Sequence, residues 1–314
     1  MRPCRVRKPT RIGECGRNSI DTAIEFVIQP MRAPRAGTAI QVVQCIYRVL
    51  SCDGMQTRLH KVLRVEGLTG ASYVLWLEGP FSAEIAPGQF AMLRTGSDWP
   101  VLLPRPFSYF DVSAAGTAAS FFGKAIGPGT RALAAVRVGD EVSVSGPLGG
   151  GFPAPADGEP EPVCIAGGVG LAPFLLWTKQ RATTVLYGGA NREAIVAMES
   201  FPGQTTFHVA TDDGSLGFHG NVLELYRSLV AAGEVDQRAP VYCCGPDPMM
   251  EAVAADCAER GVACRVSLET YMACGYGVCN GCSVAVEPAE RFGGKPWARC
   301  CIHGPVFDAA ELKW

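Results

Sequence analysis

The chain has 314 residues, of which 48% are hydrophobic and 18% charged, so it is long enough for about two or three domains and too apolar for a disordered tail. Its formal net charge of −2 argues against a nucleic-acid-binding protein, which usually carries a basic face. The sequence has no run of about 18 uncharged apolar residues and no classical signal peptide, so we expect neither a membrane span nor a secretory leader.

The first segment, residues 1–55, has no sustained helical or strand period, and its prolines and arginines are scattered. An arginine-rich start is compatible with a transit peptide, but Glu14, Asp21 and Glu25 count against one. We predict a poorly ordered extension, or a segment that precedes the natural start at Met55, because a regular pattern begins directly after that residue.

Residues 56–155 are predicted to form a β domain. Short runs rich in Val, Phe and Tyr alternate with turn material; the runs are 62–65, 73–77, 89–94, 107–112, 119–123 and 141–145. Six strands at this spacing indicate a closed or nearly closed antiparallel barrel.

One barrel strand carries the sequence Arg-Pro-Phe-Ser at residues 105–108. Arg105 is suited to bind the pyrophosphate of an anionic cofactor, and Ser108 can hydrogen-bond the polar edge of a ring on that cofactor. Taken alone the motif is weak, because such a stretch is more often merely a strand.

A second motif is the glycine-rich stretch at residues 122–130. It ends in Gly129 and Thr130, which open a predicted short helix at 131–136. A glycine-rich helix N-terminus is a natural phosphate-binding position. The alternative is that Thr130 is a plain helix cap.

Residues 149–162 are rich in Gly, Pro and Ala and are predicted to form a linker. Beyond the linker, strands and helices alternate; the predicted strands are 163–166, 184–187, 206–211 and 241–244, and the predicted helices are 172–180, 222–231 and 249–260. This alternation indicates a doubly wound parallel sheet, a nucleotide-binding α/β domain over residues 156–260. The strand at 241–244 is predicted to be the last of the sheet.

The first strand of this domain leads into a loop that contains Gly167, Gly168 and Gly170, whose backbone N–H groups can accept a pyrophosphate. The loop departs from G-x-G-x-x-G because Pro173 stands where the third glycine belongs. The next strand ends without an acidic residue, so a standard dinucleotide fingerprint is not met.

The predicted last strand ends in Cys244-Gly245-Pro246, at the carboxyl edge of the sheet, where a thiol would face a ligand in the crevice. The alternative for Cys244 is a buried core thiol.

The strongest signal is Cys274, Cys279 and Cys282, followed by the adjacent pair Cys300 and Cys301. The C-x4-C-x2-C spacing with a distant fourth cysteine is that of plant-type [2Fe–2S] ferredoxins. Glycines at 275, 277 and 281 are expected to permit the positive φ angles and the close backbone approach that such a loop needs. Zinc is the competing reading, but zinc sites favour paired C-x2-C units and this chain has only one.

The fourth ligand is open between Cys300 and Cys301. Adjacent residues of an extended segment point to opposite faces, so only one of them is expected to bind, and the other is expected to be a small buried hydrophobe. The chain has 14 cysteines, but a secreted disulfide framework would suit a small domain with a secretory signal, and this sequence shows neither feature. We therefore expect thiolates held by a metal in a reducing compartment, the cytoplasm.

Histidine shows no comparable pattern. His60, His208, His219 and His303 have no spacing typical of a metal site and suggest no Ser/His/Asp triad, so we expect surface or packing roles for them.

Taken in this order, the motifs resemble the ferredoxin–NADP reductase superfamily, and within it the electron-transfer subunits of bacterial two-subunit dihydroorotate dehydrogenases. The resemblance covers about residues 58–314. Its particular matches are residues 146–152, 211–217, 272–275 and 301–308, and the last of these favours Cys301 as the fourth ligand.

This resemblance implies an antiparallel FAD-binding barrel, an NAD-binding α/β domain and a small C-terminal [2Fe–2S] domain over residues 261–314. It implies that FAD is bound by Arg105, Pro106, Phe107, Ser108, Phe122, Gly123, Lys124, Gly129 and Thr130. It implies that NAD(H) is bound by Gly167, Gly168, Gly170, Cys244, Gly245 and Pro246, with Ser108 and Cys244 as catalytic residues. The implied cluster ligands are Cys274, Cys279, Cys282 and Cys301.

The implied activity is electron transfer. Electrons would leave the FMN of a separate dihydroorotate dehydrogenase catalytic subunit and pass through the cluster and FAD to NAD⁺, in pyrimidine synthesis. The implied partner is that catalytic subunit, in a heterotetramer with two copies of each chain. Three alternatives stay open: a sulfide- or ferredoxin-linked NAD(P)H reductase subunit, an oxygenase reductase with its own ferredoxin, and a non-catalytic zinc-stapled scaffold.

Overall fold

The computed structural model describes residues 56–96, 98–156 and 158–314. The prediction made for residues 1–55 lies outside these ranges. No helix in the described part of the chain is long and apolar enough to cross a membrane.

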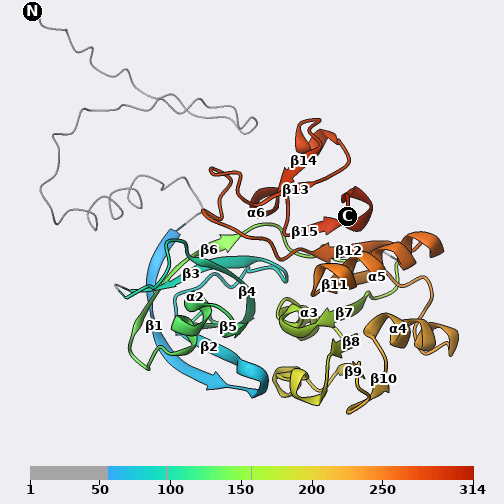
Figure 1. The fold of residues 1–314 in the computed structure, drawn as a ribbon, viewed down its shortest axis with the longest axis horizontal. Coiled ribbons are helices and arrows are strands. Elements are labelled where there is room, and N and C mark those ends of the chain that lie inside the picture. Colours follow the sequence, from blue (N-terminus) through green and yellow to red (C-terminus); the bar gives the residue numbers. More distant parts are fainter. Residues whose placement is uncertain (1–55, 97, 157) are drawn as a thin grey trace, which may run out of the picture. The chain divides into compact units, whose positions relative to one another are not determined.

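The first part of the fold is a closed six-stranded barrel (Figure 1). Its strands pair antiparallel in the order β1-β2-β5-β4-β3-β6. The strands are β1 (Gln56–Gly67), β2 (Ser72–Glu78), β3 (Phe90–Thr95), β4 (Arg105–Val112), β5 (Ala118–Lys124) and β6 (Glu141–Leu148). Every second residue points inward, so Leu75, Leu77 and Phe121 are fully buried in the barrel core.

The short helix α2 (Pro128–Ala134) packs on the barrel, and its Leu133 is buried in the barrel core. The predicted start at residue 131 is wrong by one turn. Pro128 supplies the fixed φ of a first helical residue, so the helix begins there and Gly129 and Thr130 lie inside its first turn.

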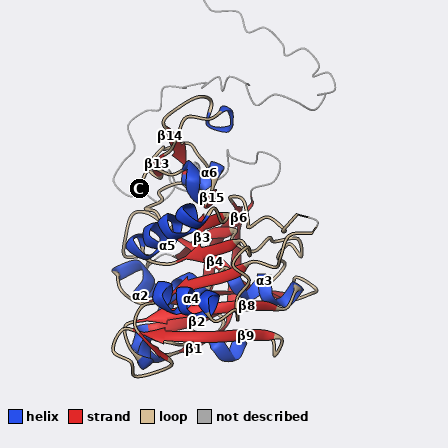
Figure 2. Ribbon diagram, turned by 90° about the vertical axis from the view of Figure 1, so that its right-hand side faces the viewer, coloured by secondary structure: helices blue, strands red, loops and turns tan. Residues whose placement is uncertain are grey.

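The second part is a seven-stranded sheet in the order β10-β9-β8-β7-β11-β12-β15. Its strands are β7 (Val163–Gly167), β8 (Thr183–Gly189), β9 (Thr205–Thr211), β10 (Phe218–His219), β11 (Val241–Cys244), β12 (Cys264–Ser267) and β15 (Val306–Asp308). All neighbours are parallel except β15, which pairs antiparallel with β12. The helices of this part are α3 (Phe174–Gln180), α4 (Val222–Ala231) and α5 (Asp247–Arg260). Figure 2 shows these helices lying against the strands.

Residues 241–244 are therefore not the last strand of the sheet, as the sequence had indicated. Two short strands follow, β12 and β15, and the second of them comes from the end of the chain. Between them lie the hairpin strands β13 (Ser283–Ala285) and β14 (Trp297–Arg299) and the helix α6 (Cys300–His303). Single 3₁₀ turns complete the fold: η1 (Thr69–Ala71), η2 (Gly168–Leu171), η3 (Arg192–Ala194), η4 (Met198–Ser200), η5 (Glu290–Phe292) and η6 (Ala309–Glu311).

Two buried clusters join these parts. Phe110 and Phe122, on the outer face of the barrel, share a cluster with Leu171 and Phe174 of the sheet domain. Full burial of one such ring is worth roughly 2–3 kcal/mol, so this contact holds barrel and sheet together. A second cluster joins Met92 of β3 to the cysteine-rich C-terminal segment and to the sheet.

Candidate functional site

The cysteine loop of residues 274–282 and helix α6 bring four thiols together in two pairs. The Sγ atoms of Cys282 and Cys301 lie 3.3 Å apart, and the Cys274 thiol contacts that of Cys279. The two pairs are close enough for Cys274 to interact electrostatically with Cys301. In the described ranges, no three or more His, Cys, Asp or Glu side chains converge on one point; the thiols stand two by two.

This pairing has a cause in the local structure. Strands β13 and β14 pair so that Ser283 lies opposite Arg299, and the N–H of Cys300 donates to the carbonyl of Cys282 at 3.0 Å. The hairpin thereby sets the third cysteine of the loop beside the fourth, 19 residues later in the chain.

Two pairs are what a [2Fe–2S] cluster requires. Each iron takes two thiolates of the protein and two bridging sulfides, which gives four cysteine ligands in all. The thiols of residues 274, 279, 282 and 301 fit this donor set.

Backbone N–H groups surround the sulfurs. Gly277 donates to Cys301 Sγ at 3.1 Å, and Gly281 donates to Cys279 Sγ at 3.4 Å. Burial acts to raise the pKa of Cys274, but donors from the backbone and the Cys279 thiol outweigh it, so that pKa lies below its usual value. The surroundings of Cys274 thus favour the thiolate, the form that binds iron, whereas burial and the neighbouring Cys282 thiol raise the pKa of Cys301.

Left-handed backbone occurs in this loop at Gly275 (φ 84°) and Gly277 (φ 81°), as expected from the sequence. The expectation for Gly281 is wrong, because the third left-handed residue is its neighbour Asn280 (φ 55°). A Cβ on Gly275 would lie 2.5 Å from Cγ of Met92 on the barrel. The cysteine loop therefore packs directly on barrel strand β3.

Cys300 and Cys301 begin helix α6, so the expected extended segment is absent at this position. Successive helical residues still point about 100° apart, and the two thiols go to different places. The Cys300 thiol faces the carbonyl of Leu268 and is buried, and burial raises its pKa to about 12. Cys301 is the one that joins the other three cysteines.

On the barrel, strand β4 presents its residues alternately to the two faces. Phe107 is buried in the barrel core against Gly123, where an added Cβ would lie 2.4 Å from Cε1 of its ring. Pro106 and Ser108 occupy the alternate positions and are half-buried. Arg105 donates to the carbonyls of Leu103 and Pro104 and makes no ion pair within the described residues.

The remaining predicted FAD residues differ in burial and in the contacts that they make. Phe122 is buried against Phe110, with ring centroids 5.5 Å apart, and Lys124 is exposed. Gly129 is buried beneath Trp99, whose ring an added Cβ would meet at 2.9 Å. The Thr130 hydroxyl accepts from the N–H of Gly127 at 3.0 Å, so it caps helix α2.

The predicted NAD loops meet at the carboxyl edge of the sheet. Strands β7 and β11 are parallel neighbours, with Ala166 opposite Cys244. A Cβ on Gly170 would lie 2.2 Å from the carbonyl oxygen of Cys244, and one on Gly167 would lie 2.9 Å from Cδ of Pro246. Gly168 is different, because an added Cβ there would meet nothing within 4 Å. At this edge Gly167 and Gly170 are therefore tightly packed, whereas Gly168 has open space beside it.

Cys244 is 2% exposed at this edge, and burial raises its pKa well above the usual value, as do Glu269 and Cys243. It is therefore a neutral thiol and not a thiolate nucleophile.

Glu269 is a residue that the sequence analysis missed. It follows β12 at the same edge, and its side chain is exposed. Loss of hydration and then the charge of Asp247 raise its pKa to about 6. The signal that could have found it is an acidic residue just after a strand, but β12 was not predicted.

Comparisons with known proteins bear on this geometry. Residues 269–313 match a family model described as the iron–sulfur cluster binding domain of dihydroorotate dehydrogenase B. The electron transfer subunit of dihydroorotate dehydrogenase B (NAD(+)) from Desulforamulus reducens is 35% identical over 263 residues, which cover 81% of this chain and 97% of that protein. The chain belongs to the family of dihydroorotate dehydrogenase B electron transfer subunits. The subunit of the same name from Shouchella clausii is 35% identical over 77% of this chain and 92% of its own length.

Solved structures agree with the fold of this electron transfer subunit family. A chain from a study of the NADH-dependent reduced ferredoxin–NADP oxidoreductase superposes with a TM-score of 0.69 at 25% identity, covering 82% of this chain and 91% of that one. The ferredoxin reductase in carbazole 1,9a-dioxygenase superposes with a TM-score of 0.57 at 21% identity, covering 66% of this chain and 67% of that one, a likeness of fold alone. The predicted family and fold class are confirmed.

Proposed function

We propose that this chain is the electron transfer subunit of an NAD⁺-linked dihydroorotate dehydrogenase B. Electrons pass from the FMN of the catalytic subunit through the cluster and FAD to NAD⁺, in pyrimidine synthesis. The observation that carries the proposal is the packing of two thiol pairs onto the barrel of a chain that shares 35% identity with a subunit of that name over 97% of its length.

The bound groups supply the redox chemistry: the flavin exchanges one or two electrons, the cluster exchanges one, and nicotinamide accepts two together. The protein supplies the positions. Cys274, Cys279, Cys282 and Cys301 hold the cluster, and the close approach of Gly275 to Met92 keeps the cluster loop against the barrel.

For FAD, Arg105 is the proposed pyrophosphate ligand, since its guanidinium has no carboxylate partner in the described part of the chain and stands at the start of β4. Ser108 is the proposed catalytic residue at the polar edge of the ring. It occupies a half-buried position on the same strand.

For NAD⁺, the proposed binding surface is the sheet edge formed by Gly167, Gly168 and Gly170 with residues 244–246. Gly168 offers the open approach that a pyrophosphate needs. Cys244 is the proposed catalytic thiol; as a neutral group it packs and orients the nicotinamide and takes no proton.

The partner is an FMN-containing catalytic subunit, with two copies of each chain in the complex. We place the work of this complex in the cytoplasm, where thiolates are kept reduced. The proposed domains are residues 56–155 for FAD binding, 156–260 for NAD binding and 261–314 for the cluster. Strands β12 and β15 belong to the cluster range in the sequence but complete the sheet of the NAD-binding domain.

The test is to co-express the chain with a candidate catalytic subunit and to measure oxidation of NADH by orotate, in which one NADH and one proton reduce one orotate. We expect NADH oxidation only when both chains and orotate are present. Reduction of a ferredoxin or a sulfur acceptor by the same preparation, with none of orotate, would replace the proposal by a reductase for another acceptor.

A further inference from the structure

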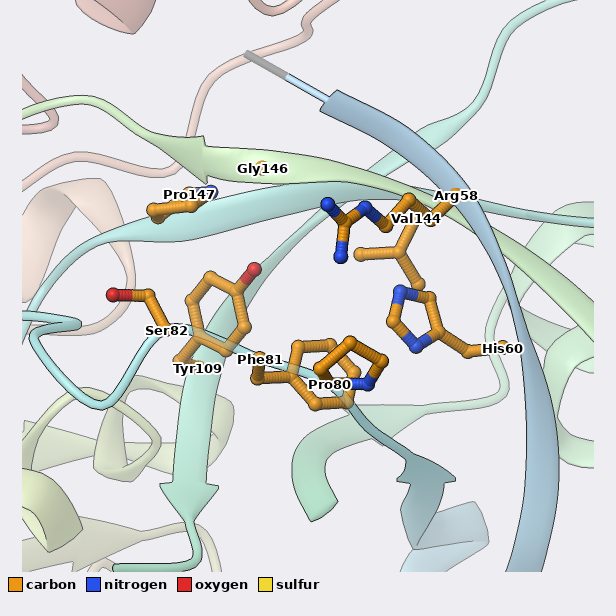
Figure 3. Close-up of a pocket in the computed structure, with 9 residues that line it drawn as sticks. All are labelled: Arg58, His60, Pro80, Phe81, Ser82, Tyr109, Val144, Gly146 and Pro147. Atoms are coloured by element: carbon orange, nitrogen blue, oxygen red, sulfur yellow. The ribbon is translucent and has the colours of Figure 1, made fainter. Parts of the chain in front are cut away.

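A separate cavity of about 230 Å³ opens in the barrel wall. Its lining comes from β1, β4, β6 and the loop that follows β2 (Figure 3). It contains none of the residues assigned above to FAD, NAD or the cluster. An inference about it therefore does not rest on the proposed function.

Four polar side chains line this cavity. The Ser82 hydroxyl accepts from the N–H of Glu84 at 3.1 Å, and the other three belong to Tyr109, His60 and Arg58. The Tyr109 side chain is 1% exposed, and its hydroxyl points into the cavity (Figure 3). Its ring is held by Phe121 and Phe81, with centroids 5.0 and 6.3 Å away. A ligand in the cavity can therefore form a hydrogen bond with this hydroxyl.

His60 is the second group, and it is 6% exposed. Its Nδ1 lies 2.7 Å from the carbonyl oxygen of Glu78. Because a carbonyl only accepts, Nδ1 carries a proton, and Nε2 is left for the cavity. The ring stacks on Phe81 with centroids 4.3 Å apart and planes 14° apart, so its orientation is fixed.

Arg58 is the third group. It projects from β1 across the cavity toward Tyr109 (Figure 3), and it makes no ion pair in the described part of the chain. No carboxylate side chain lines the cavity. A guanidinium, a hydroxyl and an imidazole thus converge on one space without a negative charge to balance them.

We propose that this cavity binds a small organic carboxylate. Its carboxylate accepts from Arg58 and Tyr109, and Nε2 of His60 donates to it when the ring is protonated. Its apolar body lies against Phe81 and Pro147. The cavity is large enough for a carboxylate with a ring-sized body, and Phe81, Val144 and Pro147 give it apolar surface that a bare inorganic anion would leave unused.

Binding should couple to the protonation of His60. Burial lowers the pKa of His60, its backbone hydrogen bond opposes this, and the charge of Arg58 lowers it further. The other titratable groups at the cavity are Arg58 itself and Tyr109, whose pKa burial raises. An anion between Arg58 and His60 favours the imidazolium, so the ligand raises the pKa of His60 and binds more tightly at acidic pH.

The test uses the full chain with isotope-labelled histidine and follows the His60 ring by NMR while benzoate is added. We expect saturable shifts, a raised His60 pKa, and an affinity that falls from pH 5.5 to pH 8. Arg58→Gln and Tyr109→Phe should each weaken binding by about tenfold or more. Arg64→Gln removes a cation from the same strand, outside the cavity, and should leave binding unchanged.

Three outcomes overturn the proposal. The first is an absence of saturable shifts with benzoate, and the second is an unchanged affinity for benzoate in Arg58→Gln. The third is equal binding of inorganic phosphate and benzoate, which would make the cavity a general anion site. Arg58 is exposed, so its variant should fold even if Tyr109→Phe does not, and unchanged circular dichroism of that variant verifies this.

Discussion

Adjacent cysteines at residues 300 and 301 show how much can depend on one position. Cys301 joins a thiol pair at 3.3 Å from Cys282, while the thiol of Cys300 turns to a backbone carbonyl in the core. The cysteine spacing left the choice of the fourth ligand open between these two residues, and the family resemblance favoured Cys301. Neither could show that a helix begins there, because four residues are too few for a helical period to be visible.

We predict that Cys279→Ser abolishes the cluster absorbance and orotate-linked electron transfer while FAD stays bound. The serine leaves one iron with a single thiolate, whereas the barrel is untouched. Iron content and visible spectra of the purified protein measure this. Cys300→Ser is the matched control and should keep the cluster; loss of the cluster in the control but not in Cys279→Ser would reverse the ligand assignment.

Arg105→Ala should weaken FAD retention by roughly 10–100-fold, because a charge-assisted contact to a pyrophosphate is worth about 1.5–3 kcal/mol. Flavin content after gel filtration measures it. Arg131→Ala, on the surface of α2, is the control. Full flavin content in Arg105→Ala would remove Arg105 from the site.

Glu269 predicts a pH effect on stability. Its folded-state pKa of about 6 lies above the ordinary value of 4.5, so protonation favours the folded state and stability falls as pH rises through this window. Glu269→Gln removes that loss and should raise the Tm at pH 7.5 relative to the parent more than at pH 4.5. The gain is below about 1 kcal/mol, since solvent screens an exposed carboxylate. Glu251→Gln on α5 controls for charge removal, and an equal gain at both pH values would contradict the assignment.

At the scale of elements, strands and helices with a clear period were predictable, and those fixed by distant partners were not. The six barrel strands are short runs rich in Val, Phe and Tyr between turn residues, and α4 has a 3.6-residue period and the capping pair Asn221 and Glu224. Strand β15 has three residues and exists because β12 pairs with it across some forty residues of chain. Its position follows from tertiary packing, which local sequence does not encode.

The contact between the loops after β7 and β11 gives a prediction at this scale. Gly170→Ala places a Cβ 2.2 Å from the Cys244 carbonyl oxygen, so one loop must move. We expect a destabilisation of about 1–3 kcal/mol and weaker NAD(H) binding, with FAD and cluster content unchanged. Calorimetric titration with NAD⁺ measures the binding. Gly203→Ala, where an added Cβ meets nothing within 4 Å, is the control.

For the whole described molecule, the arrangement of parts explains electron transfer better than any single motif. One apolar cluster fixes the barrel to the nucleotide sheet, and another fixes the cysteine segment to both. The order of barrel, sheet and cysteine loop could be predicted from the sequence. The packing of Gly275 on Met92 could not, because it joins residues more than 180 apart with no pattern in common.

The most direct test of the electron route is anaerobic reduction of the co-expressed complex by dihydroorotate without NAD⁺, followed by electron paramagnetic resonance of the cluster and then by addition of NAD⁺. We predict a reduced-cluster signal that disappears as NADH forms, and neither signal nor NADH with Cys279→Ser. NADH formation at full rate from a complex whose cluster never becomes reduced would contradict the account.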